Sequence, residues 1–285
     1  IANKNQSSIV DKELKYAQSV SANVFEIDKK SALNLVPIIK EEYIDRAIHE
    51  PDSKVMDVDL IHQGFARGLK ENNGKILFNE EAEKITKING LWNVKTKNNK
   101  FVSPILINAA GAWCDEVSIL AGCKPLNLSP KRRTVIIFEN LSNLNASQWP
   151  VVIDIEDNFY FKSEAGKILA SPADETDSPP CDAQPEELDI AMTIDRLQNA
   201  TNFNIKKINH KWAGLRSFFP DRTPIVGEDP LKSGFYWLAG QGGYGIQTSP
   251  GISKIIECLI TGTKWPDYLS DNSITPETLS PKRKI

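Results

Sequence analysis

The sequence predicts an α/β fold combined with an α+β fold, with the α+β part inserted in the middle of the chain. Two apolar runs, residues 105–110 and 234–239, each lead through glycine into a helix, as buried parallel strands do. Between the two runs, short segments alternate apolar and polar residues, which is typical of antiparallel strands. With 285 residues and 40% hydrophobic content, the chain can bury a sizeable core.

The first seventy residues are predicted to contain helices and turns only. Helices are expected over residues 11–19 and 29–34, and Val36-Pro37 ends the second because proline disfavours a helical residue before it. Asp57 occupies an N-cap position before a helix over residues 58–70. Asn72-Asn73-Gly74 closes that helix, whose apolar residues recur at helical spacing: Leu60, Ile61, Phe65 and Leu69.

The next fifty residues change to a period of two. A short strand is expected at residues 75–78, followed by a three-stranded antiparallel meander. Its strands are residues 82–88, 92–96 and 101–102, separated by Asn89-Gly90 and by residues 97–99. The run at 105–110 is then predicted to be a parallel strand covered on both faces, and Gly111-Ala112-Trp113 leads into a helix that ends at Gly122.

The remaining chain is expected to form sheet, loop and helix before the second parallel strand. Strands are predicted at residues 134–138, 151–154, 158–162 and 167–171, with a hairpin turn at 163–166. A loop covers residues 176–183, and Pro185-Glu186-Glu187 starts a helix that runs to Asn199. After the glycine cluster, a helix over residues 252–260 stops at Gly262, and the chain after Trp265 is a surface extension.

Composition excludes several classes of function. The net charge is only −3 with mixed signs, so a nucleic-acid-binding face is not expected. No apolar run reaches about 18 residues, so no transmembrane segment is expected. The cysteines and histidines are scattered without metal-ligand spacing, which predicts reduced thiols, no metal and a cytoplasmic protein, with association to a membrane surface left open. These residues are Cys114, Cys123, Cys181, Cys258, His49, His62 and His210.

Two motifs indicate the two walls of one active site. Residues 212–218 contain Arg216, and an arginine can hold a carboxylate through two parallel hydrogen bonds. Residues 240–250 contain a glycine turn that opens a helix, where backbone N–H groups can approach a planar, partly anionic ring. Together they favour flavin chemistry on an amino acid.

The start of the chain lacks the G-x-G-x-x-G turn that would bind a dinucleotide, and the chain begins at Ile1 without methionine. We therefore expect an amino-terminally truncated chain that binds FAD weakly or not at all.

Several segments resemble the FAD-dependent D-amino-acid oxidase and glycine oxidase family in their order and spacing. They are residues 108–113 (NAAGAW), 212–216 (WAGLR), 220–227 (PDRTPIVG) and the turn that closes into Thr248-Ser249-Pro250. Residues 130–134 (PKRRT), 160–162 (YFK), 171–176 (SPADET) and 241–249 are similar to the bacterial D-arginine dehydrogenase branch. The resemblance extends from about Val55 onward.

The resemblance implies roles for individual residues. Arg216 would bind the substrate carboxylate, Tyr160 would contact the same group, and Arg133 would be a second cation at the substrate entrance. Without the resemblance, the sequence predicts structural roles: Arg216 would pair with an internal carboxylate, Arg133 would be a solvated charge on an edge strand, and Tyr160 would be a core or sheet residue. Gly243 and Gln247 would lie against substrate and flavin. The other cofactor contacts would be Ala82, Ala110, Gly111, Trp113, Gly242, Tyr244, Gly245, Ile246 and Thr248.

The implied reaction is FAD-dependent oxidative deamination of a D-amino acid, D-arginine or D-lysine in the close branch, to a 2-oxo acid and ammonia. A neutral amine would drive hydride from Cα to flavin N5 without a protein base, and a quinone or oxygen would accept the electrons. Two alternatives stay open: a catalytically silent binding module and a glycine- or sarcosine-type amine oxidase.

The expected architecture is a truncated, Rossmann-like FAD-binding domain with an inserted mixed-sheet substrate domain. Its predicted parts are a helical segment on the substrate-domain side (1–54), FAD-binding parts with the meander (55–124) and at the carboxyl end (221–264), the substrate domain (125–220) and a tail (265–285).

Overall fold

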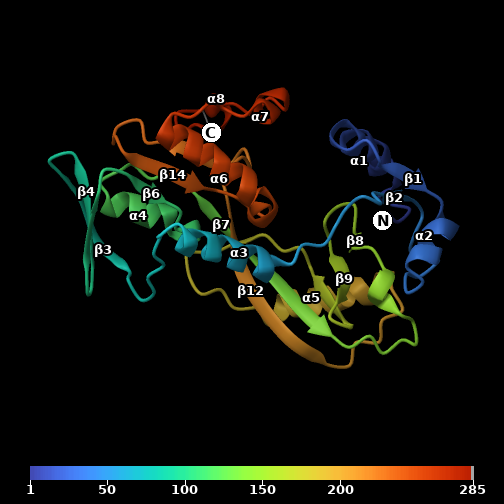
Figure 1. Ribbon diagram of the computed structural model, residues 1–285. Helices are drawn as coiled ribbons and strands as arrows, with labels where there is room; N and C mark the ends of the chain where they lie inside the picture. Colours follow the sequence, from blue (N-terminus) through green and yellow to red (C-terminus); the bar gives the residue numbers. More distant parts are fainter. Residues whose placement is uncertain (284–285) are drawn as a thin grey trace. The chain divides into compact units, whose positions relative to one another are not determined.

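A computed structural model describes residues 1–283, and its chain forms two compact units (Figure 1). Unit 1 contains Ile1–Lys54, Arg132–Thr176 and Asp182–Leu215. Unit 2 contains Val55–Lys131, Asp177–Cys181 and Arg216–Ile285. The mixture of helices, a parallel strand pair and antiparallel sheets confirms the predicted fold class. The assignment of FAD and substrate to particular segments stays a prediction.

The amino-terminal part of unit 1 contains helices and a short β-ribbon. Helices α1 (Ser7–Val20) and α2 (Lys29–Leu35) form as predicted, and the Asp28 side chain caps α2 by accepting from the Ser31 N–H. Strands β1 (Phe25–Ile27) and β2 (Ala47–His49) pair antiparallel, so the prediction of helix and turn alone is wrong here. Each strand is only three residues long, too short to show a period of two, and the pairing joins distant segments, as does Arg46, which bridges Glu26 and Asp11 at 2.6 Å each.

An antiparallel sheet forms most of the remainder of unit 1. Its order is β11 (Thr176–Asp177), β7 (Ser129–Phe138), β10 (Lys167–Ser171), β9 (Tyr160–Glu164) and β8 (Val152–Ile153), with β12 (Ile208–Phe218) also on β7. The four strands predicted between residues 134 and 171 are confirmed, whereas β12 was not predicted. Ala165 and Gly166, with φ of +48° and +80°, make the tight hairpin turn.

The core of unit 1 is aromatic and aliphatic. Helix α5 (Glu187–Ala200) begins after an N-cap at Glu186, so Pro185 precedes the helix rather than lying in its first turn as predicted. The fully buried Leu197 of α5 packs with sheet residues such as Phe138 and Phe161, and a short 3₁₀ turn (η2, Ala146–Gln148) adds to the same cluster.

A parallel strand pair lies at the centre of unit 2. Strand β6 (Leu106–Asn108) runs parallel to β14 (Phe235–Ala239), and β13 (Ile225–Glu228) pairs antiparallel with β14. A 3₁₀ turn η1 (Gly111–Trp113) leads into α4 (Cys114–Leu120), which confirms the predicted strand and helix. Burial on both faces is wrong for Ile107, which is 42% exposed because β6 is the edge strand of this three-stranded sheet.

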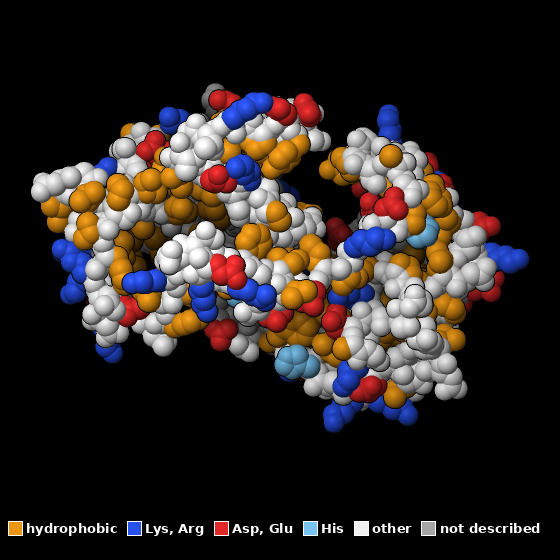
Figure 2. Space-filling view, in the orientation of Figure 1, with side chains coloured by type: hydrophobic (Ala, Val, Ile, Leu, Met, Phe, Trp, Pro, Cys, Tyr) orange, Lys and Arg blue, Asp and Glu red, His pale blue; other side chains and the backbone are white. Residues whose placement is uncertain are grey.

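The predicted meander is confirmed as β3 (Ala82–Ile88), β4 (Leu91–Thr96) and β5 (Lys100–Ser103). The Asn89-Gly90 turn has φ of +50° and +83°, as a two-residue hairpin requires. Figure 2 shows hydrophobic side chains reaching the surface over the part of unit 2 that holds β3, β4, β6 and α4. The strand expected at residues 75–78 is wrong, since that segment pairs with no described strand and Phe78 is 80% exposed.

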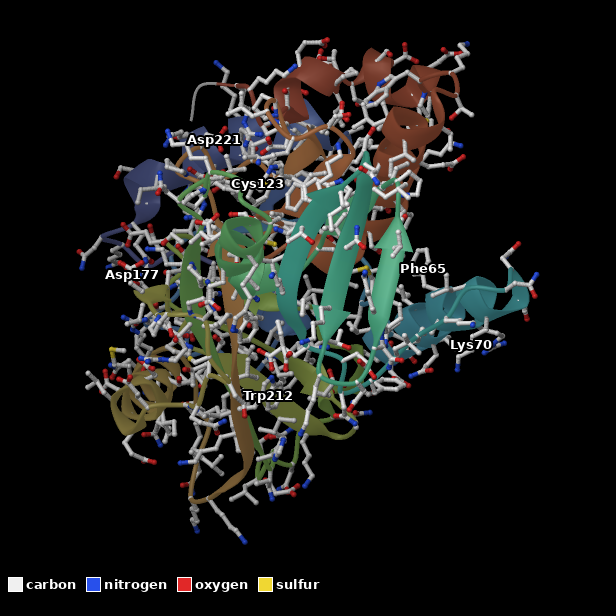
Figure 3. The ribbon with its side chains drawn as sticks, turned by 90° about the vertical axis from the view of Figure 1, so that its left-hand side faces the viewer. Phe65, Lys70, Cys123, Asp177, Trp212 and Asp221 are labelled. Carbon is white, nitrogen blue, oxygen red and sulfur yellow. The ribbon has the colours of Figure 1, made fainter. Side chains whose placement is uncertain are left out.

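Helix α3 (Val58–Glu71) forms as predicted, with the Asp57 side chain accepting from the Leu60 N–H at 2.9 Å. None of its residues is buried, although its apolar side chains follow one face. Phe65 and Lys70 mark this helix in Figure 3, where it extends beside the meander. Its formation therefore follows from local pattern and capping rather than from burial.

The carboxyl end of unit 2 is more ordered than the sequence predicts. Helix α6 (Gly245–Thr261) begins seven residues before the expected start, and Gly262 ends it in the left-handed region at φ +69°. Helices α7 (Asp267–Asp271) and α8 (Pro276–Leu279) follow, and their buried Leu269 and Leu279 join a cluster with Ile255. The expected surface extension is therefore wrong. Within residues 1–283, no helix has the length and apolar content needed to cross a membrane.

Candidate active site

A pocket of about 520 Å³ lies in unit 2, where β6 and β14 end and α6 begins. Ligands bind at this edge in open α/β sheets, because the carboxyl ends of parallel strands and the helix N-termini that follow them converge there. The lining residues are Ala109, Gly111, Arg216, Leu238, Gln241, Gly242, Gly243, Gly245, Ile246, Ser249, Ile252 and Ser253. The structure therefore brings together the two motifs, Arg216 and the glycine turn, that the sequence analysis combined.

Among residues 1–283, Arg216 is the only charged residue that lines this pocket. The side chain is half-buried on β12, and within residues 1–283 it makes neither a hydrogen bond nor an ion pair. A half-buried arginine keeps part of its side chain in contact with solvent, so its donors can stay available without an internal partner. The pocket thus presents a positive charge with no acid to neutralise it, and a carboxylate or another anion would supply the missing partner.

The N-terminus of α6 adds hydrogen-bond donors to the same pocket. The N-cap residue Tyr244 provides no side-chain cap, and the first turn contains no acidic residue. Because Thr248 is the first residue whose N–H bonds back to Tyr244, at 3.0 Å, the N–H groups of Gly245, Ile246 and Gln247 have no helical partner. In a helix of 17 residues these donors and the helix dipole favour a negative group.

The turn from Gly240 to Gly245 matches G-x-G-x-x-G, follows a strand and opens a helix, a spacing that the sequence analysis sought only at the start of the chain. Gly240 and Gly242 have left-handed φ of +76° and +54°. A Cβ on either would lie 2.4 or 2.5 Å from the ring of Phe219 or Phe218, respectively. These two glycines are used for packing protein side chains, so the match does not indicate a dinucleotide turn.

The β6–α4 turn forms another wall of the pocket. Asn108, 2% exposed, donates its amide to the Cys114 carbonyl at 2.8 Å and so fixes the turn. Gly111 has φ of +58°, and a Cβ there would meet no atom within 4 Å, so the backbone is open to a ligand at this point. Ala110 and Trp113, both predicted contacts, flank Gly111 without lining the pocket, and Trp113 is 42% exposed.

Three predicted site residues are not among the residues that line this pocket. In unit 1, Tyr160 is half-buried on β9 opposite Ser171. Arg133 donates its Nε–H to the Asp174 carbonyl at 2.7 Å and approaches the Glu175 carboxylate at 3.4 Å, so its charge is already shared. In unit 2, Ala82 begins β3 and packs against the core. Their roles in binding stay predictions.

Sequence reasoning missed part of the pocket lining. Ser249, Ile252 and Ser253 recur at helical spacing on α6, but the helix was expected to begin only at residue 252, so they were not grouped as one face. Conversely, Gln247 and Thr248 were predicted contacts but do not line the pocket. The Thr248 hydroxyl donates to the Tyr244 carbonyl at 2.8 Å and is therefore engaged by the helix itself.

The pocket contains no residue suited to proton transfer near neutral pH, since none of its lining residues is an acid, histidine, lysine or cysteine. The nearby Cys114 is fully buried, and burial raises the pKa of its thiol to about 12, which excludes it as a nucleophile. Residues 1–283 contain no cluster of acidic, histidine and cysteine side chains that could hold a metal ion. The chemistry available is anion binding and orientation.

An apolar groove of about 950 Å³ lies between α3 and α6, also in unit 2. Phe65 and Leu69 are among the apolar α3 residues that line it, and Gly64 and Gly68 leave its floor without side chains. Glu257 of α6 is its only charged lining residue. The groove offers few polar contacts, so it is a much weaker candidate for a catalytic site than the Arg216 pocket.

Comparison with known proteins identifies the family and the fold. The model of a family described as FAD dependent oxidoreductase (DAO) matches residues 2–259. An uncharacterized oxidoreductase, YurR, from Bacillus subtilis is 25% identical over 203 residues, which cover 67% of this chain and 51% of that protein. Human mitochondrial dimethylglycine dehydrogenase is 21% identical over 250 residues, covering 81% of this chain and 29% of that protein. The chain thus spans about half or less of these relatives.

A solved structure of similar fold is glycine oxidase from Geobacillus kaustophilus. It superposes with a TM-score of 0.84 at 16% identity and covers 100% of this chain and 74% of that chain. At this identity the similarity shows the fold alone. It places the strand pair, the meander and the antiparallel sheet of the present chain in one known architecture.

Proposed function

Because the chain belongs to the FAD dependent oxidoreductase family, we propose that the protein oxidises an amino acid at its Cα–N bond, with Arg216 binding the substrate carboxylate. One observation carries this proposal. Arg216 and the open N-terminus of α6 line the same pocket, and no acid or base is among the described residues that line it. Such a site can bind and orient an anion, but it cannot itself take up a proton.

The residues present fit part of the family cofactor, FAD. Its polar groups need hydrogen-bond donors and a close approach to backbone, and the pocket offers the first N–H groups of α6 and the open backbone at Gly111. We propose that these residues contact FAD and that Gly242, Gly243 and Ile246 lie on the same wall. When bound, FAD would accept a hydride from the substrate Cα.

The contribution of this chain to the reaction would be orientation. A guanidinium holding both carboxylate oxygens fixes the position and direction of Cα, which a single hydrogen bond cannot do. The amine has to be neutral so that its lone pair can assist loss of hydride. Since no lining residue can accept the amine proton, we propose that substrate binds as the neutral amine, or loses its proton to solvent before oxidation.

Two candidate substrate classes are proposed, each supported by a different observation. The motifs at residues 130–134 and 171–176 support a D-amino acid, D-arginine or D-lysine in particular. The pocket lining contains no carboxylate for a cationic side chain, so this choice rests on the motifs alone. The name of the relative dimethylglycine dehydrogenase supports a second candidate, oxidation of glycine or an N-methyl glycine.

Further features of the whole protein are proposals as well. We propose that unit 2 binds the cofactor, and the substrate-binding roles of Tyr160 and Arg133 in unit 1 are proposals that rest on the resemblance. We propose a quinone or oxygen as electron acceptor. A cytoplasmic location is supported by the four cysteines, which are all free thiols.

Substrate comparison with FAD present tests the function. D-Arginine, D-alanine, L-arginine, glycine and sarcosine are each supplied with an artificial electron acceptor, and acceptor reduction and 2-oxo acid are measured. Turnover of the D-amino acids with release of 2-oxo acid is the expected result. Faster turnover of glycine or sarcosine would replace the first candidate by the second. Absence of turnover with all five would contradict both and favour a binding module without catalysis.

A further inference from the structure

The side chain of Arg216 runs across the face of Gly243. A Cβ added at Gly243 would lie 2.9 Å from Nη1 of Arg216, 3.4 Å from its Cζ and 3.7 Å from its Cδ. Real Cβ atoms essentially never come within 3.0 Å of another heavy atom, so an alanine at residue 243 would force the end of the Arg216 side chain to move. The space that a side chain at residue 243 would fill is therefore occupied by the Arg216 side chain.

Backbone conformation does not explain why residue 243 is a glycine. Gly240 and Gly242 in the same turn need glycine because their φ angles are positive, whereas Gly243 is not in the left-handed region. Alanine could adopt the backbone of residue 243 without strain of this kind. The contact with Arg216 is thus the feature of the structure that a side chain at this position would disturb.

Within residues 1–283, the guanidinium of Arg216 has no hydrogen-bond or ion-pair partner that would hold it in one direction. The turn itself is held to β12 by a hydrogen bond from the Gly242 N–H to the Ser217 carbonyl at 2.9 Å. The turn is also held by the packing of Phe218 and Phe219 on its other two glycines. The surface that Gly243 presents to the guanidinium is therefore attached to the strand that carries Arg216.

We propose that Gly243 is a positioning residue for Arg216, setting the direction in which the guanidinium donors enter the pocket. This inference rests on the proposed function, in which Arg216 binds a carboxylate. It assigns Gly243 a task distinct from that of Gly240 and Gly242. Gly240 and Gly242 shape the turn, whereas Gly243 sets the arginine.

The test compares Gly243→Ala with Gly251→Ala, a matched control on α6 where an added Cβ would meet no atom within 4 Å. Calorimetry with the FAD-supplemented chain measures the Kd for propionate, a carboxylate without an amine. Gly243→Ala is expected to weaken binding about tenfold, within the range of coupled neighbours. Gly251→Ala should leave the Kd unchanged. Both variants should unfold near the wild-type temperature.

A double-mutant cycle separates positioning from general damage. Arg216→Met should weaken propionate binding strongly, and adding Gly243→Ala to it should cost less than about twofold more, because no guanidinium remains to be displaced. A similar penalty in both backgrounds would overturn the proposal. No effect of Arg216→Met would instead contradict the proposed function, so the two failures are distinguishable.

A readout without any ligand completes the test. The Nε–Hε NMR signal of Arg216, identified by its loss in Arg216→Met, is expected to shift in Gly243→Ala and to keep its position in Gly251→Ala. An unchanged signal in Gly243→Ala would show that residue 243 does not set the guanidinium, and would overturn the proposal even if the Kd changed.

Discussion

Replacement of Arg132 by methionine should destabilise unit 1 severely. Arg132 lies on β7 with its side chain 10% exposed, and its Nη2 is 2.9 Å from the Asp189 carboxylate. It also contacts Glu186 and lies 4.0 Å from Asp174. Both aspartate side chains are only 4% exposed, and because Arg133 still acts on Asp174, the methionine variant would chiefly leave the buried Asp189 carboxylate without its cation.

The magnitude follows from which of these contacts are buried. Removing one partner of a buried pair costs about 3–5 kcal/mol, whereas an exposed pair contributes about 0–1 kcal/mol. Glu186, 59% exposed, belongs to the second class and adds little. Thr134 still donates its hydroxyl to Asp174 and Asp189, at 3.1 and 3.3 Å, which softens the loss. We therefore expect a decrease of about 3 kcal/mol in the free energy of unfolding.

Urea unfolding at pH 7, followed by circular dichroism, measures this change. Lys131→Met is the control, because its partner Asp177 is 80% exposed, and it should cost less than about 1 kcal/mol. If Arg132→Met also costs less than about 1 kcal/mol, the burial argument is refuted.

The same variant predicts a pH dependence through Asp174. Burial, with a smaller contribution from Asp189, raises the pKa of Asp174 above its value in the unfolded chain. The folded state therefore binds the proton more tightly, so the stabilisation from Asp174 is complete below about pH 4 and is lost as pH rises through the raised pKa. Because Arg132→Met removes a compensating cation, its stability deficit should shrink as pH falls toward 4. A deficit that stays constant from pH 7 to pH 4 would contradict this linkage.

Three further changes test other parts of the structure. Cys181 is exposed, whereas burial raises the pKa values of Cys114 and Cys123 to about 12. A thiol reagent at pH 8 should therefore label Cys181 first. Rapid labelling of two or more thiols in the native chain would contradict this. Phe65→Ser should lower binding of a hydrophobic dye without lowering stability, because α3 has no buried residue; a loss above about 1 kcal/mol would mean that α3 is packed. Leu269→Ala should cost about 2–5 kcal/mol in urea unfolding, since α7 is part of the core, and an effect below about 0.5 kcal/mol would return that region to a surface extension.

Much of the fold was predictable where local pattern decides the structure. The Asn89-Gly90 turn fixes the meander, since both residues have the positive φ that a two-residue hairpin turn needs. Asp57 and Asp28 cap their helices as their sequence contexts indicate. The apolar run before Gly111 is a parallel strand because its partner, residues 235–239, has the same character.

The remaining elements depend on contacts between distant segments. Residues 75–78 have a strand pattern but no strand partner, and the β1–β2 ribbon has a partner but too few residues to show a pattern. The segment after Trp265 is anchored by two buried leucines, Leu269 and Leu279, which are ten residues apart and so form no local apolar pattern. In the site, Arg216 and the glycine turn line one pocket, as the sequence predicts, and their roles in binding stay predictions. The contact between Gly243 and Arg216 could not be foreseen, because it depends on how the turn meets β12.

The most direct test of the proposed function is the visible absorbance of the purified chain with added FAD, after removal of free FAD, on anaerobic addition of D-arginine and then of glycine. The proposed function predicts a retained band at about 450 nm, where oxidised flavin absorbs, that one of these amino acids bleaches, whereas the weak FAD binding expected of a truncated chain would leave little of this band. The same band should persist unbleached in Arg216→Met at an equal concentration of amino acid. A chain that retains no flavin, or retains flavin that neither amino acid bleaches, would contradict the proposed activity for this polypeptide.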